Sequence, residues 1–348
     1  MVGTCVGSWI KVASVSPDRY WVVLLGQGVV GIFEVFLLGV PPKLAAVWFG
    51  PHEVSTACSI GVLGSQLGIA IGFVFPPMLM HNATSTDVIE QGFYVMSITI
   101  ALVTTAILIL IIIFFRDRPP SPPSTTQLQV QVCTEETRDF WKSVKTLFAN
   151  KSYTLLMVSY GINTGIFYAI SALLNQIILI YYPDGAEDAG RIGLIIIGSG
   201  MIGSVVCGVI LDAFGRFKLT IMSVYVLCLI SMITFTFTLD SGLVAVYLVS
   251  AFFGFFMTSL LPIGYEVAVE LTFPIGEGTS GGIITAVAQA FGICFTYLYS
   301  YLLNAKNDKA ANLAMTGAIA VGAVLLIFIR FDLKRQKAQV STKRSRTL

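Results

Sequence analysis

Charged residues are scarce in this sequence. Only 11% of its 348 residues are Asp, Glu, Lys or Arg, whereas soluble domains contain roughly 25%. The net charge is only +2, and the basic residues gather at the ends of apolar segments and in the tail, so no nucleic-acid partner is expected. Hydrophobic residues make up 55% of the chain, which predicts an all-α, polytopic membrane protein embedded in a lipid bilayer.

Metal ligands and nucleophiles are equally sparse. The two histidines, His52 and His81, fall at opposite ends of one apolar run, so they cannot meet at one metal ion. The six cysteines are scattered without a Cys-x-x-Cys pair, and we expect them to be buried free thiols. The sequence shows no hydrolase motif or catalytic acid pair. It therefore predicts no metal site, no cofactor and no enzyme.

Long apolar runs dominate the chain instead. Residues 1–12 are apolar but too short to cross a bilayer, which needs about 20 helical residues, and we interpret them as the end of a helix whose beginning is absent. We expect about nine full crossings and this partial one. The nine apolar runs cover residues 20–42, 54–80, 92–115, 153–181, 191–211, 219–239, 243–270, 279–303 and 310–331.

Basic residues gather on one side of the predicted bundle. The positive-inside rule makes this side cytoplasmic. Its basic positions are Lys43, the segment 116–151, Arg216, Lys218 and the tail 332–348.

The opposite, external side is predicted to hold the loops 81–91, 183–190 and 304–309 and also Asp240. Lys306 and Lys309 weaken the charge asymmetry there without reversing it. Asn82 begins an Asn-x-Thr sequon in the first of these loops, so it is a predicted glycosylation site.

One polar linker divides the chain unequally. Residues 116–151 are rich in Pro, Ser, Thr and Gln, and they end in a helical pattern from Asp139 to Phe148 that predicts a short interfacial helix. We expect an incomplete N-terminal helical half at 1–115, this cytoplasmic linker, a six-helix half at 152–331 and a basic cytoplasmic tail at 332–348. Counted against a second half of six crossings, the first half lacks about two and a half helices.

A charged turn lies between two apolar runs of the second half. The segment 208–218 reads Gly-x-x-x-Asp-x-x-Gly-Arg-x-Lys. Its charges must reach water, because each would cost on the order of 2.5–3.5 kcal/mol at the bilayer centre. We therefore place the turn at the cytoplasmic face and expect it to act in conformational change. The residues concerned are Gly208, Asp212, Gly215, Arg216 and Lys218.

This turn resembles the signature loop of the major facilitator superfamily. Other segments are similar to the feline leukaemia virus subgroup C receptor family, among them Trp-Phe-Gly-Pro-His-Glu at 48–53 and the segments 165–176, 189–194 and 254–280. The resemblance implies a helical bundle of this superfamily and a facilitator for choline and ethanolamine, with haem as the alternative substrate. It implies the plasma membrane, with mitochondrial or endoplasmic reticulum membranes as alternatives.

Polar groups at mid-depth in an apolar segment are candidates for a substrate cavity. Gln66 and Gln289 lie midway along their segments, and their amides could bind a substrate or another helix. Tyr168 is central in 153–181, shares a helical face with Thr164, Ser171 and Asn175, and can hold a quaternary ammonium by cation–π attraction. The resemblance matches Gln66, Tyr168 and Gln289 to the family's choline site.

Three further positions are open to more than one interpretation. Asn163, beside the glycines at 161 and 165, is a tentative substrate residue on a helix that these glycines make easy to bend. Glu34 lies at mid-depth and could attract a cation or carry a proton, although the family has a neutral amide there. Glu266 and Glu270 follow Pro262, and we expect a gate or an interhelix contact.

Two observations bear on the alternative functions, the first against haem transport and the second against transport of any substrate. Haem would need an axial ligand, and no Met, Cys or Tyr cluster marks one. The family places a cation-facing Trp on its first helix, and the present tryptophans all fall at segment ends. A truncated, non-transporting isoform or fragment is therefore a further hypothesis.

Overall fold

The computed structural model describes residues 1–38, 54–79, 86–116, 140–214, 217–272, 277–305 and 308–330, with the single residues 40, 44, 48, 49 and 275. Within these ranges every regular element is a helix. The chain divides into two compact units, Met1–Glu136 and Thr137–Leu348, and the boundary falls inside the predicted linker. Each unit is described by itself.

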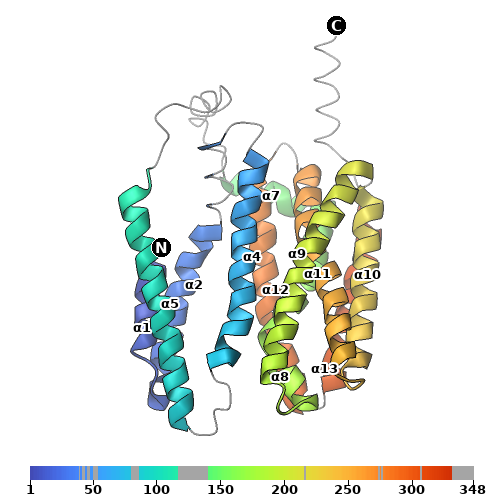
Figure 1. Cartoon of the computed structure of the whole chain (residues 1–348). Helices are drawn as coiled ribbons and strands as arrows, with labels where there is room; N and C mark the ends of the chain where they lie inside the picture. Colours follow the sequence, from blue (N-terminus) through green and yellow to red (C-terminus); the bar gives the residue numbers. More distant parts are fainter. Residues whose placement is uncertain are drawn as a thin grey trace. The chain divides into compact units, whose positions relative to one another are not determined.

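The first unit joins a short helix to longer ones (Figure 1). Its elements are α1 (Val2–Val12), the 3-10 turn η1 (Pro17–Arg19), α2 (Tyr20–Leu38), α4 (Val54–Leu79) and α5 (Thr86–Phe114). Helix α1 can lie close to α2 because Gly7 has no side chain. A Cβ atom at Gly7 would be only 2.7 Å from the carbonyl oxygen of Gly26. It is tied to α5 by Trp9, whose Nε1 donates to Thr105 Oγ1 at 2.9 Å.

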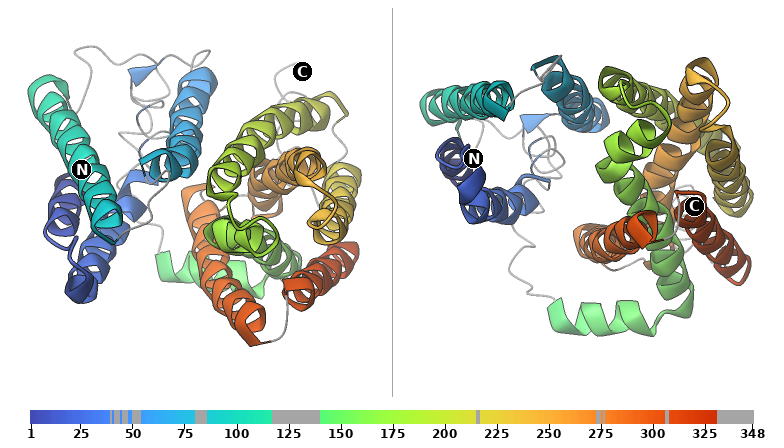
Figure 2. Two further views of the ribbon diagram at one scale, coloured as in Figure 1. Left: turned by 60° about the horizontal axis from the view of Figure 1, so that its bottom comes forward. Right: turned by 90° about the horizontal axis from the view of Figure 1, so that it is seen from below.

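The second unit is a bundle of six long helices with one short helix lying crosswise (Figure 2). The long helices are α8 (Lys151–Tyr181), α9 (Ala186–Phe214), α10 (Phe217–Thr238), α11 (Leu243–Thr272), α12 (Glu277–Ala305) and α13 (Asp308–Ile327). The crosswise helix, α7 (Phe140–Ala149), begins within one residue of the predicted interfacial helix. Leu147 of α7 is fully buried, whereas Trp141 and Phe148 are exposed.

Glycines set the closest helix contacts of this bundle. A Cβ atom at Gly165 of α8 would lie 2.8 Å from the carbonyl carbon of Phe291 in α12. In α11, a Cβ atom at Gly254 would overlap the carbonyl oxygen of Ile196 in α9. Small residues therefore let α8 approach α12 and let α9 approach α11 nearly backbone to backbone, as is common in membrane bundles.

Side-chain hydrogen bonds fix both ends of the bundle. Asn150 caps α8 by accepting from the Ser152 and Tyr153 amides, and its Nδ2 donates to the Leu271 carbonyl at 3.1 Å. At the other end, shown at the bottom of Figure 1, Tyr182 accepts from the Gly242 amide at 3.1 Å and donates to the Leu239 carbonyl at 3.2 Å. The turns at each end are thus bonded to neighbouring helices.

Eight of the described helices are long and apolar enough to cross a membrane, so this is a multi-pass membrane protein. The ninth predicted crossing corresponds to α4, in which the apolar stretch found among the described residues is the shorter Leu63–Leu79. The eight spans are Tyr20–Leu37, Val88–Phe114, Lys151–Tyr181, Ala186–Leu211, Phe217–Thr238, Leu243–Thr272, Thr279–Ala305 and Asp308–Ile327.

Two of the predicted external loops are shorter than expected. In the first, 81–91, α5 already begins at Thr86. The acidic segment 183–190 was expected to be a loop, but α9 already begins at Ala186 and carries Glu187 and Asp188 in its first turn. Carboxylates are favoured there by the partial positive charge of a helix N-terminus. Tyr247 of α11 also donates to Asp188 at 2.7 Å. The acidic residues therefore extend the helix.

Candidate functional site

Tyr168 and Gln289 lie on neighbouring helices of the second unit. Tyr168 in α8 is half-buried, and its ring lies against Gly292 of α12, where a Cβ atom would be 3.1 Å from Tyr168 Cδ2. Gln289 stands three residues before Gly292, about 4.5 Å along the helix axis, and is exposed. The structure thus brings an aromatic ring and an amide to adjacent positions at an accessible surface of this unit.

The polar face predicted on α8 is only partly accessible. Residues 159–167 are all buried; beyond them on this face, Tyr168 and Ser171 are half-buried and Asn175 is exposed. Thr164, predicted on the same face, is only 1% exposed. Helical spacing predicts which face of α8 carries Thr164, but not its burial. Its neighbours along α8 contact Phe291 of α12 and Met257 of α11.

Asn163 lies in the interior of the second unit. Its side chain is completely buried, and its Nδ2 donates to the Met257 carbonyl of α11 at 3.2 Å. The neighbouring glycines contact Phe291 of α12, and α8 runs unbroken through them. This geometry favours an interhelix bond for Asn163 and close packing, in place of bending, for Gly161 and Gly165.

The amide Gln66 lies in α4 of the first unit and is half-buried. The glycines around it were expected to form a close-packing face, but no described atom of this unit would lie within 4 Å of a Cβ atom at Gly64, Gly68 or Gly72. That face is therefore open within its own unit. Gln66 remains a predicted substrate residue on an accessible helix.

The first unit contains a polar pair that the sequence did not indicate. Lys11 of α1 donates from Nζ to Gln27 Oε1 of α2 at 2.9 Å. Gln27 lies seven residues before Glu34, which is also exposed, so the two share one side of α2. The i, i+7 spacing in this apolar segment could have revealed Gln27, whereas its pairing with Lys11 depends on how α1 packs.

The predicted gating carboxylates occupy different environments. Glu266 is exposed, whereas Glu270 is only 6% exposed and lies among buried residues of α11. Nearby, Tyr265 donates to the Gly281 carbonyl of α12 at 3.1 Å and also bonds Thr285. This end of α11 is therefore joined to α12, and the burial of Glu270 suits an interhelix contact.

The charged turn is described only in part. Gly208 lies half-buried near the end of α9, and Lys218 is exposed in the first turn of α10. Asp212 falls within α9, but its side chain lies outside the described part of the structure, as do Gly215 and Arg216. The predicted glycosylation site Asn82 is also outside the described residues.

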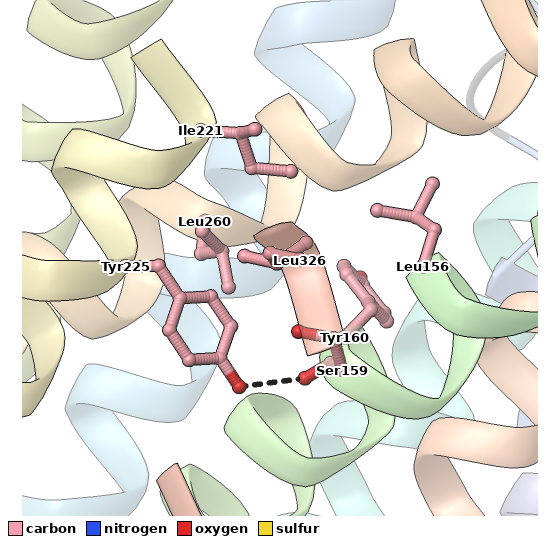
Figure 3. Close-up of a pocket in the computed structure, with 7 residues that line it drawn as sticks. All are labelled: Leu156, Ser159, Tyr160, Ile221, Tyr225, Leu260 and Leu326. Atoms are coloured by element: carbon pink, nitrogen blue, oxygen red, sulfur yellow. Dashed lines mark hydrogen bonds between the residues drawn. The ribbon is translucent and has the colours of Figure 1, made fainter. Parts of the chain in front are cut away.

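A small void lies in the core of the second unit (Figure 3). It is bordered by a chain of two hydrogen bonds: Tyr225 donates to the Ser159 carbonyl at 2.9 Å, and Ser159 Oγ donates to the Gly322 carbonyl at 2.9 Å. The void has no room for a water molecule. It is therefore a packing gap between α8, α10, α11 and α13, not a substrate cavity.

The second unit is thus a bundle of long apolar helices that presents a few amide and aromatic groups. Two solved structures share this fold. A bacterial homologue of the human lysosomal transporter Spinster aligns over 96% of this chain and 82% of its own, with 12% identity and a TM-score of 0.65. The Escherichia coli fucose:proton symporter FucP aligns over 94% of this chain and 83% of its own, with 14% identity and a TM-score of 0.58.

Sequence comparison identifies the family. The Major Facilitator Superfamily profile matches residues 1–272. An uncharacterized MFS-type transporter of Caenorhabditis elegans is 46% identical over 97% of this chain and 58% of its own length. The zebrafish choline/ethanolamine transporter flvcr2a is 44% identical over 97% of this chain and 72% of its own length. The human choline/ethanolamine transporter FLVCR2 is 42% identical over 97% of this chain and 64% of its own length. The chain belongs to the major facilitator superfamily and, within it, to the feline leukaemia virus subgroup C receptor family.

The chain spans 58% of the length of the nematode relative, 72% of the zebrafish transporter and 64% of the human one.

Proposed function

We propose that this chain acts as a facilitative membrane transporter for choline, ethanolamine or a related small organic cation. The observation that carries the proposal is the 44% identity with the zebrafish choline/ethanolamine transporter flvcr2a along 97% of the chain. Transport would proceed by alternating access, in which two helical halves expose a central site to each side of the membrane in turn. The plasma membrane is the proposed location.

Three residues are proposed to contact the cation. The half-buried ring of Tyr168 offers an aromatic face, which attracts a quaternary ammonium more strongly when water is excluded. Gln289, one turn from Gly292, offers an amide that can bond the hydroxyl shared by choline and ethanolamine. In the first unit, taken by itself, Gln66 is proposed as a further amide for a substrate, and Glu34 remains a tentative contributor of negative charge.

Other polar residues are proposed to control the conformational change. The segment 208–218 and the carboxylates Glu266 and Glu270 belong to the end of the second unit predicted to be cytoplasmic. Their contacts would form in one conformation and break in the other, as transporter gates require. Asn163 remains a tentative substrate residue: its Nδ2 donates to the Met257 carbonyl and holds α8 against α11, whereas its buried Oδ1 accepts no hydrogen bond from the described residues.

Uptake of labelled choline and ethanolamine tests the function directly. Cells with low endogenous uptake would express this chain, its Tyr168→Ala variant or zebrafish flvcr2a as the positive control, with surface protein quantified in each case. Saturable uptake of either cation by the unchanged chain supports the proposal. Absence of both, while flvcr2a is active, contradicts it, and haem export measured in the same cells would then support haem as the substrate instead.

A further inference from the structure

Gly292 is the α12 residue against which the Tyr168 ring lies. It is buried, and a Cβ atom there would be 3.1 Å from Tyr168 Cδ2, 3.6 Å from Cβ and 3.8 Å from Cγ. A side chain at position 292 would therefore contact the edge of the Tyr168 ring that is nearest to the α8 backbone. The contact is tight enough that a methyl group at this position would require the ring to move by a few tenths of an ångström.

The two proposed substrates differ in how they would sense such a displacement. The trimethylammonium group of choline has no N–H donor, so it depends on close contact with an aromatic face. The primary ammonium of ethanolamine has three N–H donors and can turn them toward amide or carbonyl oxygens. A small movement of the ring should therefore weaken choline binding more than ethanolamine binding.

We propose that Gly292 is a positioning residue that sets the preference for choline over ethanolamine by allowing the Tyr168 ring to lie against α12. The inference rests on the proposed function, because it assumes that Tyr168 contacts the cation. Gly292 itself has no side chain to offer a substrate. It acts by leaving space for the Tyr168 ring. The preference for choline over ethanolamine would therefore depend on the absence of a methyl group at position 292.

Gly292→Ala tests this with the ratio of choline to ethanolamine uptake, which does not depend on how much protein reaches the surface. We expect the ratio to fall by about threefold to tenfold, a part of the usual cation–π contribution, mainly through a higher KM for choline. Gly292→Ser, with a larger group, should lower the ratio further. Gly282→Ala is the matched control on α12, because Gly282 is exposed and its Cβ would meet no described atom within 4 Å.

A double variant shows whether the effect passes through the ring. In a Tyr168→Ala background there is no ring to displace, so adding Gly292→Ala should leave the uptake ratio unchanged. An equal loss of both uptakes in Gly292→Ala would overturn the inference, because it would indicate packing alone. An unchanged ratio, or a change that persists without Tyr168, would overturn it too. Failure of the proposed function looks different, since the unchanged chain would then transport neither cation.

Discussion

Lys309 Nζ lies 3.0 Å from Asp240 Oδ2, so the start of α13 is joined to the turn between α10 and α11 by an ion pair. Lys309 is one of the two basic residues that weaken the charge asymmetry used to orient the chain. In the folded protein its positive charge is thus paired with a carboxylate at the same end of the bundle.

The ion pair predicts a small loss of stability in acid. The Lys309 ammonium donates a hydrogen bond to Asp240 and holds the pKa of that carboxyl below its usual range. A lowered pKa stabilises the folded protein above the unfolded pKa of about 4, and the contribution is lost as pH falls through the folded value. Asp240→Asn should therefore lower the thermal midpoint slightly at pH 7, and the difference should disappear once the pH has fallen below the lowered pKa of Asp240. Because both side chains are 49% exposed, the difference should also shrink in high salt; a difference that persists in acid would contradict the assignment.

The contact between α9 and α11 predicts a large difference between two glycine substitutions. Gly254→Ala would drive a methyl group into the backbone of Ile196, and overpacking of this kind costs about 1–3 kcal/mol. Gly198→Ala in α9 is the control, since no described atom lies within 4 Å of its Cβ position. Thermal unfolding of both variants in detergent checks the prediction. Equal midpoints would show that the two helices are less closely packed than described.

A buried bond between α12 and α13 predicts a measurable coupling. Tyr299 donates to Asn312 Oδ1 at 2.8 Å, and both side chains are completely buried. Tyr299→Phe would leave the Asn312 oxygen without its donor, so we expect a loss of about 0.5–2 kcal/mol in unfolding free energy. The double variant Tyr299→Phe with Asn312→Leu should cost less than the sum of the single changes. Additive losses would mean that the two residues contribute independently.

Two substitutions of Tyr168 separate its ring from its hydroxyl. Tyr168→Phe keeps an aromatic face and should retain most choline uptake. Tyr168→Ala removes the face, and the loss of a desolvated cation–π contact of about 2 kcal/mol corresponds to a roughly 30-fold rise in the choline KM. Initial rates over a range of choline concentrations distinguish the two. A Tyr168→Phe variant as impaired as Tyr168→Ala would instead assign the binding energy to the hydroxyl.

The sequence predicted the helices well because apolar length is the dominant signal in a membrane protein. It misplaced the start of α9, since Glu187 and Asp188 read as loop residues until the helix N-terminus is considered. It also proposed both Tyr168 and, tentatively, Asn163 as substrate residues. Asn163 is completely buried, whereas Tyr168, five residues later, is half-buried. Periodicity gives the angle of a side chain around its helix, but the neighbouring helix at that level decides whether the side chain is accessible. Gly292 carried no signal at all, because its role lies in the space it leaves for another residue.

Helix α12, which carries Gln289, also carries Cys294, two residues beyond Gly292 and about 200° from it around the helix axis. Among the cysteines whose surroundings are described, Cys5, Cys207 and Cys228 are buried, and Cys294 is exposed. A thiol-directed reagent should thus distinguish this position from those three, with Cys58 and Cys133 replaced by serine. The chain carries a native attachment point for a fluorescent or spin label on the helix of Gln289, facing away from the Tyr168 contact at Gly292, so its signal could follow movements of α12 in a membrane.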